Sequence, residues 1–138
     1  MTENPFKHGH GGSFAYIKNG DGSLLYSTSE NLYCLDFIYS KKEGNGSKLI
    51  QEFVKTVGDN KNIFVSCITE SRTLFYLEQI GAMEYVEKLN KSLIIDDEEL
   101  LNRIKIVRLL KAGGITVNNI KICFNSEAKL SISLEGTT

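Results

Sequence analysis

The fold of this chain is decided by residues 31–68, which read NLYCLDFIYSKKEGNGSKLIQEFVKTVGDNKNIFVSCI. The first stretch, residues 31–40, is apolar on both alternating faces except at Asp36, which is typical of a central strand covered on both sides. Apolar residues then recur at helical spacing up to Gly58, which ends this helix. A second buried strand follows at residues 61–68. Such a unit normally joins two parallel strands by a right-handed crossover.

The segments on either side of this unit continue the alternation of strands and helices. Before it, FAYIK and SLLYS flank Asn19-Gly20-Asp21-Gly22, and this pattern predicts a β-hairpin. After it, Thr69 or Ser71 can cap a helix. The further expected elements are a helix over residues 71–80, a strand over 85–95, a helix over 96–111, and two last strands, ITVNNIKICF and KLSISL.

The chain has 138 residues, which is about the size of one domain. Residues 1–13 are polar and rich in glycine, and we expect them to be a mobile N-terminus. No internal repeat or linker follows. We therefore predict one domain over residues 14–138, in which residues 96–138 are a C-terminal extension.

The composition excludes several classes of protein. The net charge is −1, so no basic face for nucleic acid is indicated. No apolar run is long enough for a membrane span, and the N-terminus lacks the pattern of a secretory signal. The three cysteines, Cys34, Cys67 and Cys123, lie in apolar stretches without the spacing of a zinc or redox pair. We expect them to be reduced and buried in a cytoplasmic protein. His8 and His10 have no further ligand nearby in sequence, so we predict no metal site.

Residues 41–49 (KKEGNGSKL) join the first strand of the central unit directly to its helix. The first N–H groups of a helix have no partner within it, and the helix dipole favours an anion there. Gly44 and Gly46 let the backbone approach a phosphate, and the three lysines of the segment add positive charge. The segment predicts a phosphate or pyrophosphate site. A tight connection without a ligand is the alternative.

The phosphate-binding pattern that fits is Q/R-x-x-G-x-G/A followed by a helix. Gly44 and Gly46 stand at its two small positions, and Lys41 stands where glutamine or arginine is usual. A Walker loop and a dinucleotide fingerprint do not fit. Together with residues 71–85 (SRTLFYLEQIGAMEY), a helix that ends in glycine, this turn resembles the GNAT superfamily of acyl-coenzyme A-dependent N-acyltransferases.

The resemblance covers residues 32–85 by motif and residues 14–95 by the order of elements. It implies an α/β (α+β) fold with a GNAT-like mixed central sheet and helices on both faces. An N-terminal β-hairpin and a C-terminal helix plus two strands complete the expected fold. It also implies that acetyl-CoA binds with its pantetheine in a gap between the two central strands. The residues that the resemblance implies for coenzyme A contacts are Phe37, Ile38, Tyr39, Lys41, Lys42, Glu43, Gly44, Asn45, Gly46, Ser47, Lys48 and Ser71.

Acyl transfer to an amine needs a base for the ammonium and an acid for the leaving thiolate. Glu30 and Asp36 are candidate bases because the alternation of a strand puts residues six apart on one face. The alternatives are a structural carboxylate at Asp36 and a solvated turn residue at Glu30. Tyr76 is the candidate acid, but the family usually places this tyrosine where Leu77 stands here. A packing role is the alternative for Tyr76.

Our expectation for the acceptor and the partners rests on elements that the family usually has and this sequence lacks. The N-terminal helices that often shape the acceptor site in this family have no counterpart, so we expect an open site and an amine on a protein, a lysine or an N-terminus. The alternative is a binding protein that keeps the fold without turnover and docks on a partner. A homodimer through residues 96–138 is also open.

Overall fold

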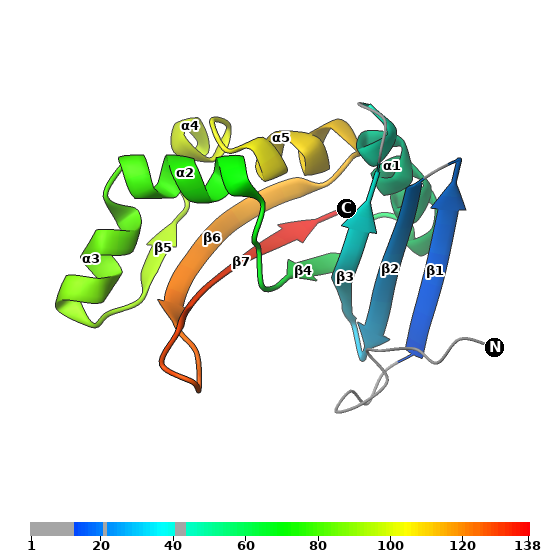
Figure 1. The fold of residues 1–138 in the computed structure, drawn as a ribbon. Coiled ribbons are helices and arrows are strands. Elements are labelled where there is room, and N and C mark those ends of the chain that lie inside the picture. Colours follow the sequence, from blue (N-terminus) through cyan, green and yellow to red (C-terminus); the bar gives the residue numbers. More distant parts are fainter. Residues whose placement is uncertain (1–12, 21, 41–43) are drawn as a thin grey trace.

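The computed structural model of the chain describes residues 13–20, 22–40 and 44–138. In this part, seven strands form one mixed sheet and five helices pack beside it (Figure 1). The strands are β1 (Ser13–Asn19), β2 (Gly22–Ser29), β3 (Leu32–Tyr39), β4 (Asn62–Val65), β5 (Leu93–Ile95), β6 (Thr116–Phe124) and β7 (Leu130–Thr137). The helices are α1 (Asn45–Val57), α2 (Ser71–Gln79), α3 (Ala82–Leu89), α4 (Glu98–Leu101) and α5 (Lys105–Ala112).

The unit β3–α1–β4 lies in the middle of the sheet and is the crossover that the sequence predicts. β3 and β4 pair in parallel, from Leu32 opposite Asn62 to Leu35 opposite Val65. The other neighbouring strands are antiparallel, in the order β1-β2-β3-β4-β7-β6-β5. The predicted hairpin is confirmed by the antiparallel pairing of β1 with β2.

A glycine flanks α1 at each end, as the sequence indicates. Gly44 has a φ of 85° and Gly58 a φ of 89°, a region that glycine enters at little cost. The Gly58 N–H donates to the Val54 carbonyl at 2.9 Å. The apolar face of the helix is buried against β1 and β2, through Leu49, Ile50, Phe53 and Val57.

Residues 85–95 are not one strand, and that prediction is wrong. They contain the end of α3 and the short strand β5. Ala82 and Val86 are buried on one face of α3, and Asn90, with a φ of 52°, ends the helix. A short apolar run fits the period of a helix and that of a strand equally, and packing of α3 against β6 favours the helix.

The single helix predicted over residues 96–111 is two helices, α4 and α5. The chain is extended at Ile104, with a ψ of 127°, and the Ile104 side chain is fully buried. Nothing in the local sequence interrupts the helical spacing at this point. We attribute the break to the burial of Ile104 in the core, which turns the chain before α5 begins.

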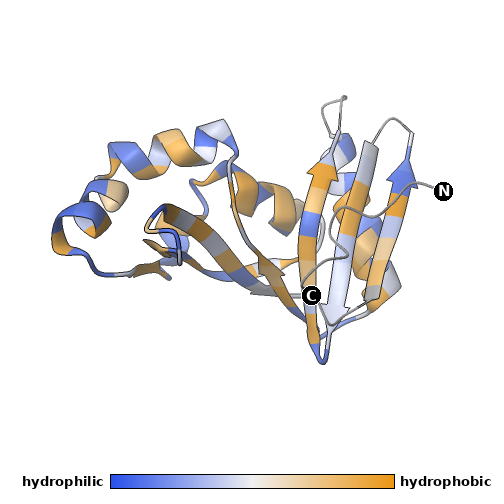
Figure 2. Cartoon of the chain, turned by 60° about the horizontal axis from the view of Figure 1, so that its bottom comes forward, coloured by the Kyte–Doolittle hydropathy of each residue, from blue (hydrophilic) through white to orange (hydrophobic). Residues whose placement is uncertain are grey.

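The described helices cover one face of the sheet, so the expectation of helices on both faces is wrong for this part of the chain. Ile122 of β6 and Ile132 of β7 point into the core. Lys121 and Glu135, which alternate with core residues along the same two strands, are exposed on the other face. Figure 2 shows this alternation of hydrophobic and hydrophilic residues along the strands. α1 and α2 each pack against α5, and α2 packs against α3, so these four helices lie on the same side of the sheet. α3, α4 and α5 also contact β6, whose Ile120 and Ile122 are both buried in the core.

The open face also includes part of β3. Phe37 and Tyr39 are each 45% exposed. The apolar sequence of β3 predicts a central strand that is covered on both sides. β3 is central in the sheet, but this part of it is not covered on both sides. None of the described helices is long and apolar enough to cross a membrane.

Phe53 lies at the centre of the core between α1 and the sheet. It is 0% exposed, and its ring centre lies 4.9 Å from that of Tyr26. We expect Phe53→Ala to lower the free energy of unfolding by about 3–5 kcal/mol, because a large buried ring leaves a cavity. Urea unfolding measures this loss.

Phe75→Ala is the matched control, since Phe75 is 62% exposed on α2. It should change the free energy of unfolding by less than about 1 kcal/mol. Equal losses in the two variants would contradict the assigned packing of α1.

Candidate functional site

β3 and β4 pair with each other only along the first half of β3. Beyond it, each chain segment stays hydrogen-bonded to its neighbour on the other side. Beyond Leu35, β3 continues beside β2, where Phe37 lies opposite Leu25. The chain after β4 stays with β7, since the Ile68 N–H donates to the Ile132 carbonyl at 2.9 Å. The two parallel strands therefore separate toward their carboxyl ends, where open α/β sheets generally bind ligands.

A β-bulge at Asp36 accompanies the separation. Leu25 pairs with Phe37 and Tyr26 with Leu35, so Asp36 is the extra residue of β3. A bulge bends its strand and resets the alternation of side chains. Ile38 therefore packs against the core together with Leu35, although strict alternation would have placed it on the face of Asp36.

The separated strands leave a cleft of about 390 Å³. Its walls are the end of β3, the chain between β4 and α2, and the side of α5 that faces them. Most of the lining is apolar, and its polar side chains are those of Asp36, Ser66, Cys67, Thr69, Glu70 and Lys105. The volume is at the lower end of the roughly 300–1,000 Å³ usual for small-molecule sites.

Asp36 holds an unsatisfied oxygen in this cleft. Its Oδ2 atom is buried and has no hydrogen-bond partner among the residues that the structure describes. Burial raises the pKa of the neighbouring Cys34 thiol, and the charge of Asp36 raises it further. A buried oxygen without a partner costs about 1–3 kcal/mol, so a donor on a bound ligand would be favoured here.

Glu70 caps α2 at the edge of the cleft. Its carboxylate accepts hydrogen bonds from the Arg72 N–H at 3.0 Å and from the Thr73 N–H and hydroxyl, both at 2.8 Å. Partial burial acts to raise the pKa of Glu70, but these hydrogen bonds and the charge of Lys105 outweigh it and hold the pKa below its ordinary value. Glu70 is therefore the capping residue, in place of the predicted Thr69 or Ser71.

Cys67 does not fit the prediction that the cysteines are buried. It is exposed, lines the cleft and has a φ of 54°, which is uncommon for a residue with a side chain. Cys34 and Cys123 are partly buried on strands. The apolar run over residues 61–68 indicates a strand up to Ile68, but β4 ends at Val65 and Cys67 lies in the turn toward α2.

The N-terminus of α1 carries no side-chain cap, as expected for a phosphate site, but α5 packs beside it. Gly44 is the N-cap residue and supplies no side chain. A Cβ atom added at Gly46 would lie 3.2 Å from Leu109 Cδ1. At the last residue of α5, the Ala112 carbonyl accepts from Gln51 Nε2 at 3.3 Å. α5 thus covers one side of the first turns of α1.

The structure places the predicted coenzyme A contacts in three groups. Phe37 and Ile38 line the cleft, whereas Tyr39 follows them on β3 and is half exposed. Residues 44–48 form the N-cap and first turn of α1. Ser71 begins α2 directly after Glu70. Lys41, Lys42 and Glu43 lie outside the described residues, as do His8 and His10 of the expected mobile N-terminus.

The three predicted catalytic residues are not brought together. Asp36 lies in the cleft, but Glu30 is an exposed residue of the turn before β3, with a φ of 54°. The expectation that Glu30 shares a strand face with Asp36 is wrong, because β3 begins at Leu32. The distance from Leu32 to Asp36 along the strand is about 13 Å. Tyr76 is partly buried against the core and is not among the residues that line the cleft.

Two charged residues of the cleft were not predicted from sequence, namely Glu70 and Lys105. Glu70 stands directly before a helical pattern, and its acidic side chain was a usable signal for a cap. Lys105 comes from an element far along the chain, and no local pattern connects it with β3.

Comparison with protein-family models finds no match for this chain, and neither do comparisons with curated proteins and with solved structures.

The Glu70 cap should make the stability of α2 depend on pH. The pKa of Glu70 is lowered in the folded state, so its contribution is present above the ordinary glutamate pKa and is lost as the pH falls through the lower folded value. We expect Glu70→Gln to lower the free energy of unfolding by about 1 kcal/mol at neutral pH.

Urea unfolding of both proteins at pH values from neutral to about 3 tests this. The difference between wild type and Glu70→Gln should shrink as the solution becomes more acidic. A difference that stays constant down to acid pH would show that the Glu70 charge does not stabilise the fold.

Proposed function

We propose that this protein is an acetyl-CoA-dependent N-acetyltransferase that acts on an amine of a protein. The observation that carries the proposal is the cleft between β3 and β4, which opens at the bulge of Asp36 and is bounded by α5 and by Ile50 of α1. The resemblance of residues 32–85 to the GNAT superfamily supports it.

The separated strands suit a ligand that is itself built like a strand. Beyond Leu35 and Val65, β3 and β4 no longer pair with each other. Pantetheine is an extended chain with two amides, so it can hydrogen-bond to strand backbone as an inserted strand would. In this proposal it lies beside Phe37 and Ile38, with the mostly apolar walls of the cleft around it.

The phosphates of the ligand require a cationic or N–H-rich end of the cleft. The uncapped N-terminus of α1 offers backbone N–H groups with a favourable dipole. Lys105 on the cleft wall adds a positive charge, although its neighbour Glu70 offsets part of it. Lys41 and Lys42 precede α1 in the sequence and lie outside the described residues.

Asp36 is the residue best placed to act as a base. Acetyl-CoA supplies the acetyl group as an activated thioester. The unsatisfied Oδ2 atom of Asp36 can accept a hydrogen bond from the ammonium of the acceptor and then take its proton, directly or through a water. The Ile68 N–H already donates to Ile132, so an N–H that polarises the thioester carbonyl must come from a neighbour such as Cys67.

The open face of the sheet gives the acceptor its approach. The described helices pack on the opposite face, and Phe37 beside Asp36 is half exposed. An amine on the surface of a protein can reach such a site without passing through a narrow channel. This favours a protein lysine or N-terminus over a small molecule that would need enclosure.

A second candidate, a binding protein of similar fold without turnover, is favoured by one observation. Leu109 packs against Gly46, so α5 covers part of the surface where a pyrophosphate would lie on α1. Tyr76 also does not line the cleft, so no acid for the leaving thiolate has been found among the predicted residues. Such a protein would act by docking on a partner.

Isothermal titration with acetyl-CoA tests the first candidate, with desulfo-coenzyme A and ATP as comparison ligands. We expect saturable binding of acetyl-CoA and desulfo-coenzyme A. Ser66→Trp should weaken it at least about tenfold, because an indole at the cleft wall fills the space. Ser126→Trp, in the turn between β6 and β7, is the matched control and should bind as the wild type does.

Asp36→Asn separates binding from turnover. It should retain acetyl-CoA binding and lower the acetylation rate of a lysine-containing peptide mixture about 10²- to 10⁴-fold, measured by release of free thiol. If Ser66→Trp binds acetyl-CoA as tightly as the wild type does, acetyl-CoA does not bind in the cleft. Absence of binding at millimolar acetyl-CoA would leave the docking protein as the better candidate.

A further inference from the structure

A second apolar surface lies at the far edge of the sheet, away from the cleft between β3 and β4. It is a groove of about 330 Å³ formed by the start of α3, the edge strand β5 and the start of α4 (Figure 1). We call it the β5 groove. Four of its lining side chains are large, apolar and exposed, namely Ile80, Tyr85, Ile94 and Leu100.

The exposure of these side chains is costly unless something covers them. Ile94 is 57% exposed on a strand of three residues, and Tyr85 and Leu100 face the same groove from two helices. Exposed apolar patches of this kind mark interaction surfaces on soluble proteins. β5 is also the last strand of the sheet order, and an edge strand presents unpaired backbone groups.

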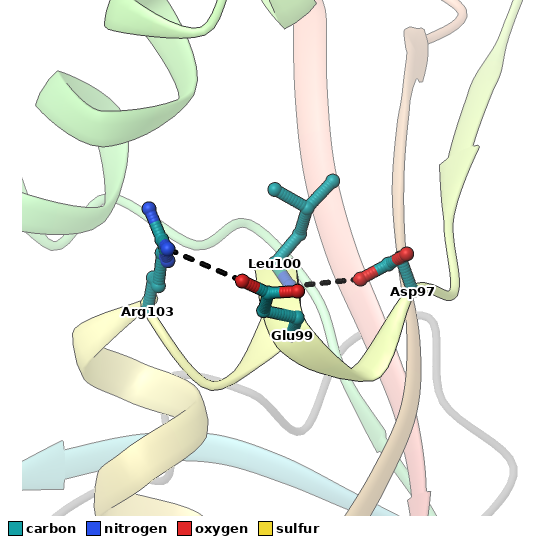
Figure 3. Close-up of polar contacts among 4 residues, drawn as sticks. All are labelled: Asp97, Glu99, Leu100 and Arg103. Carbon is teal, nitrogen blue, oxygen red and sulfur yellow. Dashed lines mark hydrogen bonds and ion pairs between the residues drawn. The ribbon is translucent and has the colours of Figure 1, made fainter.

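The chemistry of the rim decides what fits the groove. Four consecutive carboxylates follow β5, those of Asp96, Asp97, Glu98 and Glu99, and the first two line the groove. Two of them already have partners close in sequence: Asp97 accepts from the Leu100 N–H at 3.0 Å, and Glu99 pairs with Arg103 at 3.3 Å (Figure 3).

The remaining charge on the rim is negative. Among the residues that the structure describes, the side chains of Asp96 and Glu98 have no hydrogen bond or ion pair, and both residues are exposed. The nearby Lys88 on α3 is already paired with Glu84 at 2.7 Å. An occupant that brings Lys or Arg beside its apolar side chains would therefore meet complementary charge.

We propose that the β5 groove is the docking site for an extended segment of a partner protein in which apolar side chains alternate with Lys or Arg. Such a segment adds a strand along the free edge of β5, places its apolar side chains against Ile94 and Tyr85, and directs its cations toward Asp96 and Glu98. This inference stands apart from the cleft and from acetyl transfer.

A second copy of this chain is a poorer occupant. A symmetric contact through the groove would place the same surface of both copies face to face. Such a contact would gather Asp96, Asp97 and Glu98 of both copies at one interface, and this concentration of like charge is destabilising. The acidic rim therefore favours a basic partner over self-association.

The test is a titration of the full chain, labelled with ¹⁵N, with three short synthetic peptides followed by NMR. The peptides alternate Lys with Leu, Glu with Leu, and Lys with Ser. We expect the Lys/Leu peptide to bind and to shift the amides of residues 80–100, with much weaker effects from the other two. The affinity for the Lys/Leu peptide should fall as the salt concentration rises.

Two groove variants and two matched controls locate the binding. Ile94→Asp should weaken binding of the Lys/Leu peptide at least about tenfold, and Asp96→Asn with Glu98→Gln should weaken it about threefold or more. Leu32→Asp, at another exposed leucine, and Glu127→Gln should leave the affinity unchanged. Thermal unfolding confirms that each variant is folded.

Three results would overturn the proposal. The first is equal binding of the Lys/Leu and Glu/Leu peptides, and the second is binding that Ile94→Asp leaves intact. The third is concentration-dependent dimerisation of the wild type that Ile94→Asp abolishes, since the groove would then be occupied by a second copy.

Discussion

The separation of β3 from β4 is the constraint on which the rest of this structure depends. β2 holds the end of β3, and β7 holds the chain after β4 through the bond from Ile68 to Ile132, so the two parallel strands cannot stay paired. The extra residue at Asp36 lets β3 bend away while Leu35 and Ile38 both remain in the core. The same bend leaves the Asp36 oxygen without a partner. A feature of strand pairing thus creates both the space and the polar group of the candidate site.

α5 sets the size and the character of that space. It packs against α1 and contributes Lys105 and Leu109 to the cleft wall. It therefore narrows the space beside Gly46 at the start of α1. Its position depends on the break at Ile104, because a continuous helix from Glu98 would point elsewhere. The cleft wall and the cover over α1 therefore both follow from the position of α5. This is why the same geometry is compatible with the proposed enzyme and with a docking protein.

The arrangement of the helices on one face separates the two surfaces that matter most. The cleft opens in the middle of the sheet, where none of the described helices covers the other face and Phe37 and Tyr39 are half exposed. The β5 groove lies at the edge, where the sheet ends in a strand of three residues beside an acidic run. The mixed polar face of β6 and β7, with Lys121 and Glu135, lies between them. A partner could engage the edge without closing the cleft.

The sequence by itself determined the central unit of this protein. Helical spacing from Leu49 to Val57, with glycines at both ends, and apolar runs before and after it specify a strand, a helix and a strand, because local periodicity and backbone freedom decide these elements. Only the tertiary structure decided that residues 82–89 are helical, that Glu30 is remote from Asp36, and that Cys67, Glu70 and Lys105 meet in one cleft. These outcomes depend on which strands pair and on what each buried face contacts. Such contacts join residues far apart in the chain, and no local pattern records them.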